Sequence, residues 1–163
     1  MEAGSLSKGY REMKIAVISD THTRSLHNLP EKLVTKLGEV DLIVHAGDFT
    51  EKSLLDELQT LGEVKAVCGN MDSGEIRRML SPKELFVIEG KNIGLTHGTG
   101  SRWGITERVR GMFDRPDIII YGHSHTPENE IVHGVLMFNP GTAAKSFGLI
   151  TIEKEIRAEI ITF

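Results

Sequence analysis

Short apolar runs alternate with amphipathic stretches through the first two thirds of the chain. Strands are predicted where Ile and Val gather, and helices where Leu recurs every three or four residues. The predicted strands are 14–18, 41–44 and 63–67, and the helices between them are 29–37 and 53–61. Gly38 and Gly62 follow the two helices and would end them. This strand–helix order predicts a parallel sheet with right-handed crossovers.

The rest of the chain has a different pattern. Segments 84–88 and 92–95 are strand-like and are joined by a Gly90-Lys91-Asn92 turn, which is typical of a hairpin. A helix is predicted over 105–113 and a buried strand over 118–121. Four more strand-like pieces follow, at 131–132, 136–138, 148–152 and 156–161. There is no internal repeat and no low-complexity linker, so one mixed α/β domain is predicted for residues 13–163.

Residues 1–12 show no periodicity and are rich in small and polar side chains. We predict a flexible N-terminal tail, either a cloning remnant or an upstream start, because Met13 would make a natural first residue. The tail also lacks the apolar middle and the cleavage site of a signal peptide.

Composition and charge exclude several classes of protein. With 163 residues, 39% hydrophobic and 26% charged, the chain is of ordinary globular composition and long enough for a good core. A net charge of -4 and no basic stripe predict no stable nucleic-acid partner. No apolar run approaches ~18 residues, so no membrane span is expected. The single cysteine, Cys68, excludes an intramolecular disulfide and suits a cytoplasmic location.

Metal-capable side chains stand beside Gly or Ser at five predicted strand ends. The five segments are Ser19-Asp20-Thr21-His22, His45-Ala46-Gly47-Asp48, Gly69-Asn70-Met71-Asp72, Thr96-His97-Gly98 and Gly122-His123-Ser124-His125. The carboxyl ends of parallel strands gather at one edge of a sheet, where ligands bind. Asp-x-His and His-x-His place two side chains on one side of an extended segment. Glycine lets the backbone turn sharply and approach a bound phosphate.

The chemistry of these side chains points to a catalytic metal site. Carboxylate, imidazole and amide oxygen without thiolate match Mn²⁺, Fe or Zn²⁺ better than a structural zinc site. Each motif alone is commonly a turn or a helix cap, but five in series argue against chance. Seven ligands suit two ions roughly 3.5–4 Å apart that share a carboxylate. The candidates, taken as both metal ligands and catalytic residues, are Asp20, His22, Asp48, Asn70, His97, His123 and His125.

This series of motifs resembles the calcineurin-like metallophosphoesterase superfamily. The compact length and the sequences Gly-His-Ser-His-Thr-Pro at 122–127 and Asn-Pro-Gly-Thr at 139–142 are similar to its small prokaryotic YfcE-type phosphodiesterase family. The resemblance covers residues 13–163 and implies two facing mixed β-sheets flanked by helices.

The resemblance also implies how the metals are shared. It assigns Asp20, His22, Asp48 and His125 to one ion. It assigns Asp48, Asn70, His97 and His123 to the other, so that Asp48 bridges. The implied cofactor is a pair of divalent ions, Mn²⁺ first, with Ni²⁺, Fe or Zn²⁺ as alternatives.

The implied activity is hydrolysis of a small-molecule phosphodiester by direct attack of a metal-bridging hydroxide, without a phosphoenzyme. A phosphomonoesterase and a cyclic-nucleotide phosphodiesterase would use the same chemistry. A non-enzymatic protein-binding scaffold of the retromer-subunit type is a further alternative. A DNA nuclease is disfavoured, because the chain has neither room for capping domains nor a basic surface. Whether the protein forms a homo-oligomer stays open.

Two departures from the family pattern are informative. Met71 stands where many relatives carry a histidine that assists the leaving group, so activated aryl esters should react fastest. Cys68 stands where relatives often carry an arginine. Loops 72–80 and 98–103 are expected to decide substrate choice, with Arg102 and Trp103 lining a pocket or, for Trp103, simply packing.

The remaining polar residues have plainer interpretations. We expect His45 to be a packed core histidine, and His27 and His133 to lie on the surface. Asp72 would either orient a metal ligand through a hydrogen bond or simply close a turn. Thr142 would either lie close to the metal site or serve only in the Asn-Pro-Gly-Thr turn.

Overall fold

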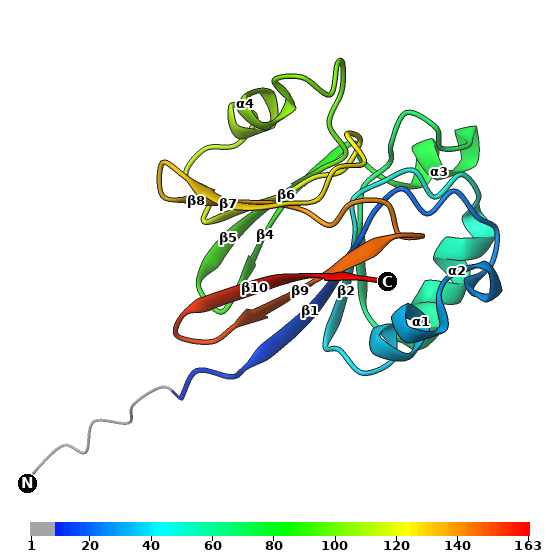
Figure 1. The fold of residues 1–163 in the computed structure, drawn as a ribbon, viewed down its shortest axis with the longest axis horizontal. Helices are drawn as coiled ribbons and strands as arrows, with labels where there is room; N and C mark the ends of the chain where they lie inside the picture. The colour runs from blue at the N-terminus through cyan, green and yellow to red at the C-terminus, as the bar shows by residue number, and fades with distance from the viewer. Residues whose placement is uncertain (1–8) are drawn as a thin grey trace, which may run out of the picture.

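Two five-stranded β-sheets face each other in the computed structural model, which describes residues 9–163 (Figure 1). The first sheet has the order β10-β9-β1-β2-β3 and the second β4-β5-β6-β8-β7. The strands are β1 (Met13–Ile18), β2 (Leu42–His45), β3 (Val64–Ala66), β4 (Lys83–Ile88), β5 (Lys91–Thr96), β6 (Ile118–Ile120), β7 (Glu128–Val132), β8 (Val135–Asn139), β9 (Ser146–Ile152) and β10 (Ile156–Thr162). The helices are η1 (Leu26–Asn28), α1 (Glu31–Leu37), α2 (Lys52–Leu61), α3 (Gly74–Met79) and α4 (Ile105–Arg110). The predicted fold class is confirmed.

Both sheets are mixed. β1 pairs in parallel with β2, and β2 with β3, as the strand–helix alternation predicts. β9 joins β1 antiparallel and pairs with β10 in the C-terminal hairpin. In the second sheet β5, β6 and β8 are parallel, and β4 and β7 are antiparallel edge strands.

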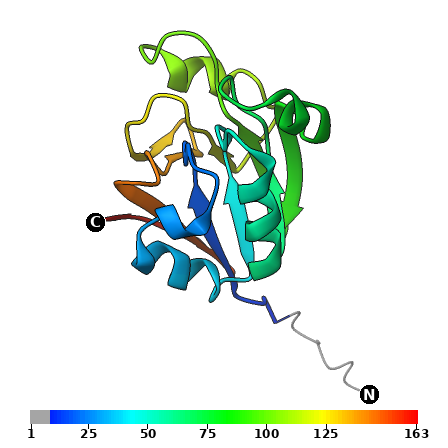
Figure 2. The ribbon, with the colours of Figure 1, turned by 90° about the vertical axis from the view of Figure 1, so that its right-hand side faces the viewer.

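Apolar side chains form three clusters that hold the layers together. Ile15 and Val17 of β1 point between the sheets, where they meet side chains of β2, β5, β6, β8 and β9. Ala16 and Ile18 point to the other face, where α1 and α2 cover the first sheet (Figure 2). The third cluster lies under α4, on the outside of the second sheet. Because β1 is buried on both faces, its sequence is a continuous apolar run rather than an alternating one.

Two predicted helices are shorter than their patterns suggest, and the short helices η1 and α3 were not predicted. The helix predicted from residue 29 begins at Glu31, because a residue before proline avoids the helical region and Pro30 follows Leu29. The helix predicted to residue 113 ends at Arg110. The prediction of segment 72–80 as a loop was wrong. It contains α3, a single short turn with one buried residue, which is too brief to show periodicity.

The N-terminal prediction is only partly described. Residues 1–8 lie outside the described residues, and residues 9–12 carry no helix or strand before β1 begins at Met13. Within residues 9–163, no helix has the length and apolar character needed to cross a membrane.

The loops that leave the carboxyl ends of the strands meet at one edge of the two sheets. Asp20 N–H donates to the carbonyl of Gly47 over 3.0 Å, which joins the loops after β1 and β2. Gly122 N–H donates to the carbonyl of His97 over 3.1 Å, which joins those after β5 and β6. A Cβ on Gly47 would lie 2.9 Å from the Cβ of His97, so the two sheets touch here.

Candidate metal centre

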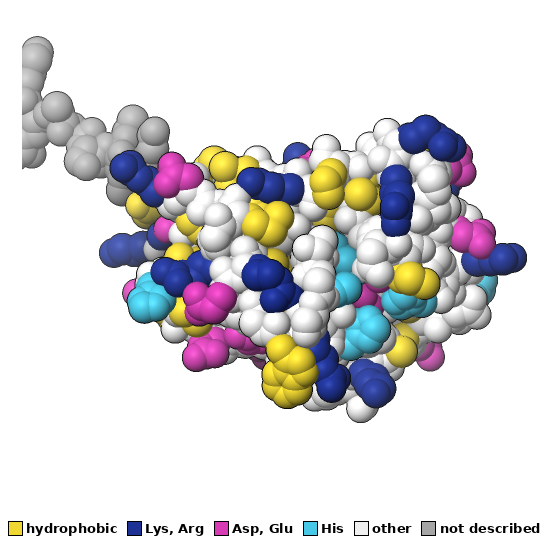
Figure 3. All heavy atoms as spheres, turned by 90° about the horizontal axis from the view of Figure 1, so that it is seen from above, with side chains coloured by type: hydrophobic (Ala, Val, Ile, Leu, Met, Phe, Trp, Pro, Cys, Tyr) yellow, Lys and Arg dark blue, Asp and Glu magenta, His cyan; other side chains and the backbone are white. Residues whose placement is uncertain are grey.

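All seven predicted ligands lie at this edge, and each contacts at least one other. Asp20 Oδ1 is 3.2 Å from His125 Nε2, 3.8 Å from His97 Nε2 and 3.9 Å from His22 Nε2. Asp48 Oδ2 is 3.2 Å from His97 Nε2 and 3.8 Å from His22 Nε2. On one face of the molecule, histidine side chains gather around a hollow with acidic atoms between them (Figure 3).

Asn70 and His123 make up the remaining pair. His123 Nδ1 lies 3.2 Å from Asn70 Oδ1, and the His123 ring stands edge-on to the His97 ring with centroids 5.2 Å apart. The other ring nitrogen, Nε2, lies 2.7 Å from the carbonyl oxygen of Gly100 and donates to it. This bond leaves the lone pair of Nδ1 facing Asn70, which is the tautomer a metal ligand needs.

Two groups of three side chains have ligand atoms within 4.8 Å of one another, namely Asp20, His22 and His125, and Asp20, Asp48 and His97. Asp20 belongs to both groups, whereas the resemblance implies Asp48 as the shared residue. Asp48 Oδ2 nevertheless lies between His22 and His97, which the resemblance assigns to different ions. Both carboxylates therefore face both halves of the cluster.

Two buried atoms of this cluster have no hydrogen-bond partner among the described residues: Asp20 Oδ1 and His97 Nε2. The 3.2 Å approach of His97 Nε2 to Asp48 is not aligned as a hydrogen bond. His97 Nδ1–H donates to the Ala46 carbonyl over 2.7 Å, so the Nε2 lone pair points at the carboxylates. Leaving a buried polar atom unpaired costs ~1–3 kcal/mol. Bound divalent cations would satisfy these two atoms, so the donor set fits a metal site.

Protonation in the cluster follows from its packed charges. Burial tends to raise the pKa of Asp48, but His97 and the backbone N–H of Met71 outweigh it and lower that pKa. Burial tends to lower the pKa of His97, but Asp48 and Asp20 outweigh it and raise that pKa. The metal-free site therefore attracts positive charge. Protons and metal ions would compete for it, and metal affinity should fall in acid.

The backbone is strained where it carries the candidate ligands. Five of the seven residues have a positive φ, namely Asp20 (52°), His22 (46°), Asp48 (62°), His123 (68°) and His125 (61°). Such strain gathers at functional sites, where surrounding contacts must maintain it. The glycines serve this packing. A Cβ on Gly69 would lie 2.1 Å from Asp48 Oδ1, and one on Gly122 would lie 2.0 Å from Ser19 Oγ. These two glycines thus make room for protein side chains, where the sequence suggested room for phosphate.

Asp72 holds two ligand loops in place. Its buried carboxylate accepts the backbone N–H groups of Gly69 (2.7 Å), Asp48 (3.0 Å) and Thr50 (2.8 Å). Of the two interpretations of Asp72, the structure favours a supporting role behind the ligands, because a turn residue would not bind the neighbouring loop. Ser19, which the sequence did not single out, supports Asp20 by donating to its Oδ2 over 2.7 Å.

His45 is a core histidine, as predicted. It is fully buried and stacks on Phe49 with centroids 3.5 Å apart. Gly47 N–H donates to Nδ1 over 3.0 Å, and Nε2–H donates to Thr21 Oγ1 over 3.0 Å. Burial, followed by the charge of His97, lowers the pKa of His45 well below its usual range. His45 is therefore neutral, and it braces the loop that carries Asp48.

The other singled-out residues lie nearer the surface. His27 and His133 are exposed, as predicted. Arg102 and Trp103 line a cavity of about 420 Å³, and Trp103 is 78% exposed, so its interpretation as plain packing was wrong. Thr142 contributes its backbone carbonyl to a turn, accepting from the N–H groups of Lys145 and Ser146.

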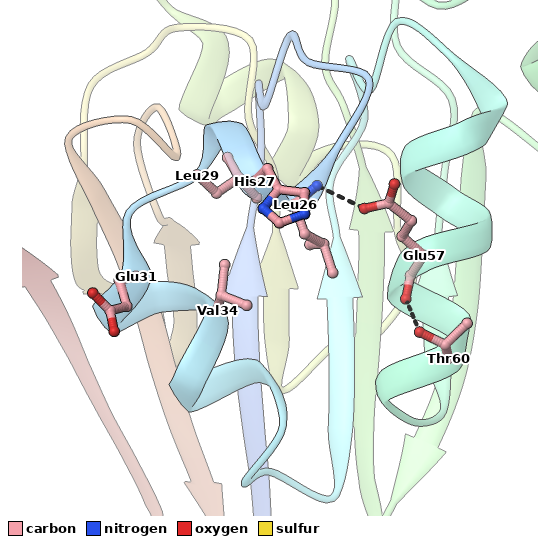
Figure 4. Close-up of a pocket in the computed structure, with 7 residues that line it drawn as sticks. All are labelled: Leu26, His27, Leu29, Glu31, Val34, Glu57 and Thr60. Carbon is pink, nitrogen blue, oxygen red and sulfur yellow. Dashed lines mark hydrogen bonds between the residues drawn. The ribbon is translucent and has the colours of Figure 1, made fainter.

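A second cavity, of about 460 Å³, lies among η1, α1 and α2 on the helical side of the first sheet (Figure 4). Its most buried acid, Glu57, already accepts Leu26 N–H over 2.8 Å and the Ser25 hydroxyl over 3.2 Å. This carboxylate therefore serves to anchor η1 on α2.

Comparison with known proteins decides the family. The family model of the calcineurin-like phosphoesterase superfamily domain matches residues 13–154. The chain belongs to this superfamily. A probable metallophosphoesterase of Methanocaldococcus jannaschii is 36% identical over 91% of this chain and 81% of its own length. A phosphodiesterase of the same organism is 28% identical over 91% of this chain and 99% of its own length.

Solved structures agree with the calcineurin-like fold. A Thermotoga maritima protein, TM1076, superposes with a TM-score of 0.75 at 29% identity, covering 93% of this chain and 99% of that one. Vps29 of Entamoeba histolytica, complexed with Zn²⁺, superposes with a TM-score of 0.69 at 26% identity, covering 92% and 99%. The resemblance seen in the sequence is thus confirmed, and with it the expectation of a phosphoester hydrolase.

Proposed function

We propose that this calcineurin-like protein is a metal-dependent phosphodiesterase that hydrolyses small phosphodiesters by direct attack of water at a dinuclear site. The observation that carries the proposal is the pair of buried, unpartnered atoms, Asp20 Oδ1 and His97 Nε2, inside a cluster of seven ligand-type side chains. A turn or a structural hydrogen-bond network would leave neither atom unsatisfied.

The contacts support the seven-residue ligand set that the resemblance implies, and the approach of Asp48 Oδ2 to both His22 and His97 supports Asp48 as the bridging residue. One ion would be held by Asp20, His22, Asp48 and His125, and the other by Asp48, Asn70, His97 and His123. Mn²⁺ is the proposed metal, with Ni²⁺, Fe and Zn²⁺ as alternatives. When bound, such ions supply an activated water and neutralise the charge of the phosphate.

Exposure indicates how a substrate would approach. The carboxylates of Asp20 and Asp48 are 0% and 3% exposed, whereas the imidazoles of His22 and His125 are 36% and 54% exposed. The acidic groups thus form the floor of the site and the histidines its rim. A phosphodiester anion would therefore enter past the exposed histidines and not past the buried carboxylates, whose negative charge would repel it.

The test begins with protein stripped by a chelator and then titrated with Mn²⁺, using bis(p-nitrophenyl) phosphate as substrate. Hydrolysis should appear only with metal, and calorimetry should count two ions per chain. Asp48→Asn should lower kcat/KM by more than about 100-fold, because changing only an outer partner of a metal ligand already costs roughly 10–100-fold. Asp56→Asn is the matched control, since Asp56 lies on α2 paired with Lys52. Undiminished turnover by stripped protein, or by Asp48→Asn, would refute the proposal.

Direct attack has its own readout. A substrate made chiral at phosphorus should be hydrolysed with inversion of configuration, as a single in-line displacement requires. Retention of configuration would show a covalent intermediate instead.

A protein-binding scaffold is the second candidate, favoured by the structural likeness to Vps29. A scaffold would bind a partner protein and show no metal-dependent turnover on any ester, so the same assay separates the two. A panel of mono-, di- and cyclic esters then separates phosphodiesterase from phosphomonoesterase activity. A cytoplasmic location and a domain over residues 13–163 stay predictions.

A further inference from the structure

The loop from Thr99 to Trp103 presents the chain's single tryptophan to solvent beside the metal centre. Trp103 is 78% exposed, the highest value among the exposed large apolar side chains. The loop follows His97 directly, and its Gly100 carbonyl accepts the 2.7 Å hydrogen bond from His123. The position of Trp103 is therefore tied to two of the proposed metal ligands.

Arg108 holds this loop in one conformation. Its guanidinium donates to the carbonyls of Thr99 (2.9 and 3.2 Å), Trp103 (2.9 Å) and Ser101. Trp103 N–H also donates to Ser101 Oγ over 3.1 Å. A loop fixed by so many bonds carries an exposed aromatic ring at a defined place, as a binding platform requires.

Trp103 forms one wall of the 420 Å³ cavity. The cavity is lined by Arg102, Trp103, Ile105, Thr106, Ser124, Thr126 and Glu128. Ser124 and Thr126 are the immediate neighbours of the proposed ligand His125, so the cavity opens at the edge of the metal centre. The guanidinium of Arg102 lies over the Trp103 ring, 5.5 Å from the ring centroid, and both side chains line the cavity together with the carboxylate of Glu128.

The carboxylate of Glu128 is only half engaged. Its Oε2 accepts the hydroxyls of Tyr121 and Thr106, the latter over 3.0 Å. No donor among residues 9–163 reaches Oε1. These bonds fix the carboxylate while leaving one acceptor for a ligand N–H.

We propose that this cavity binds the base of a nucleotide phosphodiester, with the base stacked on Trp103 and one of its N–H groups donating to Glu128 Oε1. The inference rests on the proposed function, because the metal centre would hold the phosphate of the same substrate. A nucleobase is the class that fits. It has the flat face that aromatic platforms bind, whichever base it is. It also has the N–H donors that an alkyl chain or a plain aryl ring lacks.

The kinetic test compares two substrates with the same leaving group, thymidine 5′-(p-nitrophenyl phosphate) and methyl p-nitrophenyl phosphate. The nucleotide should be preferred in kcat/KM by about tenfold or more, the usual scale of a stacked base. Trp103→Ala should abolish that preference and Trp103→Phe should keep most of it. Val87→Ala, which removes another exposed apolar side chain on β4, should leave it unchanged. A preference that survives Trp103→Ala, or an equal loss on both substrates, would overturn the proposal.

A binding test needs no turnover. Because the chain has one tryptophan, its fluorescence reports on Trp103 alone. Adenosine 5′-monophosphate should quench it saturably in the Mn²⁺-treated protein, and ribose 5-phosphate should not. Glu128→Ala should weaken the binding of adenosine 5′-monophosphate about tenfold. Equal responses to the two ligands would overturn the base site. If neither ester is cleaved but quenching is base-specific, the phosphodiesterase proposal fails and the base site stands.

Discussion

Replacement of Gly69 by alanine would test whether the position of Asp48 matters to within an ångström. Gly69 follows β3, and an added Cβ would lie 2.1 Å from Asp48 Oδ1, 2.7 Å from Asp48 N and 2.9 Å from Asp48 Cγ. Gly69 is not among the residues with positive φ, so alanine would suffer no backbone strain there. The perturbation is therefore a steric push on the Asp48 carboxylate and, to a smaller extent, on the backbone nitrogen of the same residue.

The distance between the added Cβ and Asp48 Oδ1 gives the size of the displacement. Side chains do not approach closer than about 3.0 Å to a Cβ, so the Asp48 oxygen or the Gly69 backbone must give about 0.9 Å. The oxygen cannot slide freely, since Met71 N–H holds it at 2.8 Å. Overpacking of this kind costs about 1–3 kcal/mol of stability. Misplacing a catalytic group by about 1 Å costs roughly 100-fold in rate. Gly69→Ala should thus lose about two orders of magnitude in kcat and stay folded.

The assay is the Mn²⁺ titration of bis(p-nitrophenyl) phosphate hydrolysis, run beside thermal unfolding. Gly62→Ala is the matched control, because nothing lies within 4 Å of its Cβ position and its φ of 164° is extended. That control should behave as the parent. If Gly69→Ala unfolds as the parent does and keeps its rate within twofold, the position of Asp48 is not critical and the reasoning fails.

Three more outcomes follow from the site. Asp72→Asn replaces one acceptor oxygen with an amide group that would face a backbone N–H. The substitution should lower the free energy of unfolding in urea by about 1–3 kcal/mol and should weaken metal binding about 10–100-fold by calorimetry. Unchanged values for both would show that Asp72 does not support the site. Because burial lowers the pKa of His45, the unfolded chain takes up a proton there below about pH 6.5 that the folded chain does not, and stability should fall with the pH. The raised pKa of His97 changes stability in the opposite direction, so the parent and His45→Gln must be compared, both without metal. Between about pH 7 and pH 5.5 the free energy of unfolding of His45→Gln should fall less than that of the parent, and equal losses in the two proteins would contradict this prediction. Met71 is exposed beside the site and has no proton to donate, so p-nitrophenyl diesters should be cleaved far faster than dialkyl esters in stopped assays, and equal rates would point to another acid.

The predictable part of this fold is the part where burial fixes the residue types. β1 and β2 are buried on both faces, so their apolar runs stand out from the flanking sequence. The seven ligand candidates could be found because each follows a predicted strand within a few residues, and parallel strands end at one edge. The short helix α3 has one buried residue and left no pattern to read.

What the sequence did not reveal are contacts between polar groups of separate loops. Nothing in the sequence near Arg108 indicates that its guanidinium fixes the loop that carries Trp103. The far end of that loop, at Thr99, lies nine residues before Arg108 in the chain. Likewise, nothing in the sequence indicates that the Ser19 hydroxyl donates to Asp20 over 2.7 Å. Periodicity reports which face of an element is buried, and such bonds depend on how loops are placed after the strands have paired.

The unusual features of the metal centre have a common physical origin. Five of the seven candidate ligands adopt the left-handed region, and buried carboxylates and imidazoles lie within 4 Å of one another. This arrangement strains the backbone and leaves Asp20 Oδ1 and His97 Nε2 unpaired among the described residues. The same crowding raises the pKa of His97 while His45, behind it, stays neutral. A sequence selected for stability alone would relieve these costs with smaller or neutral residues. Under the proposed function, bound cations would satisfy these charges, so that metal binding would both stabilise the fold and complete the site.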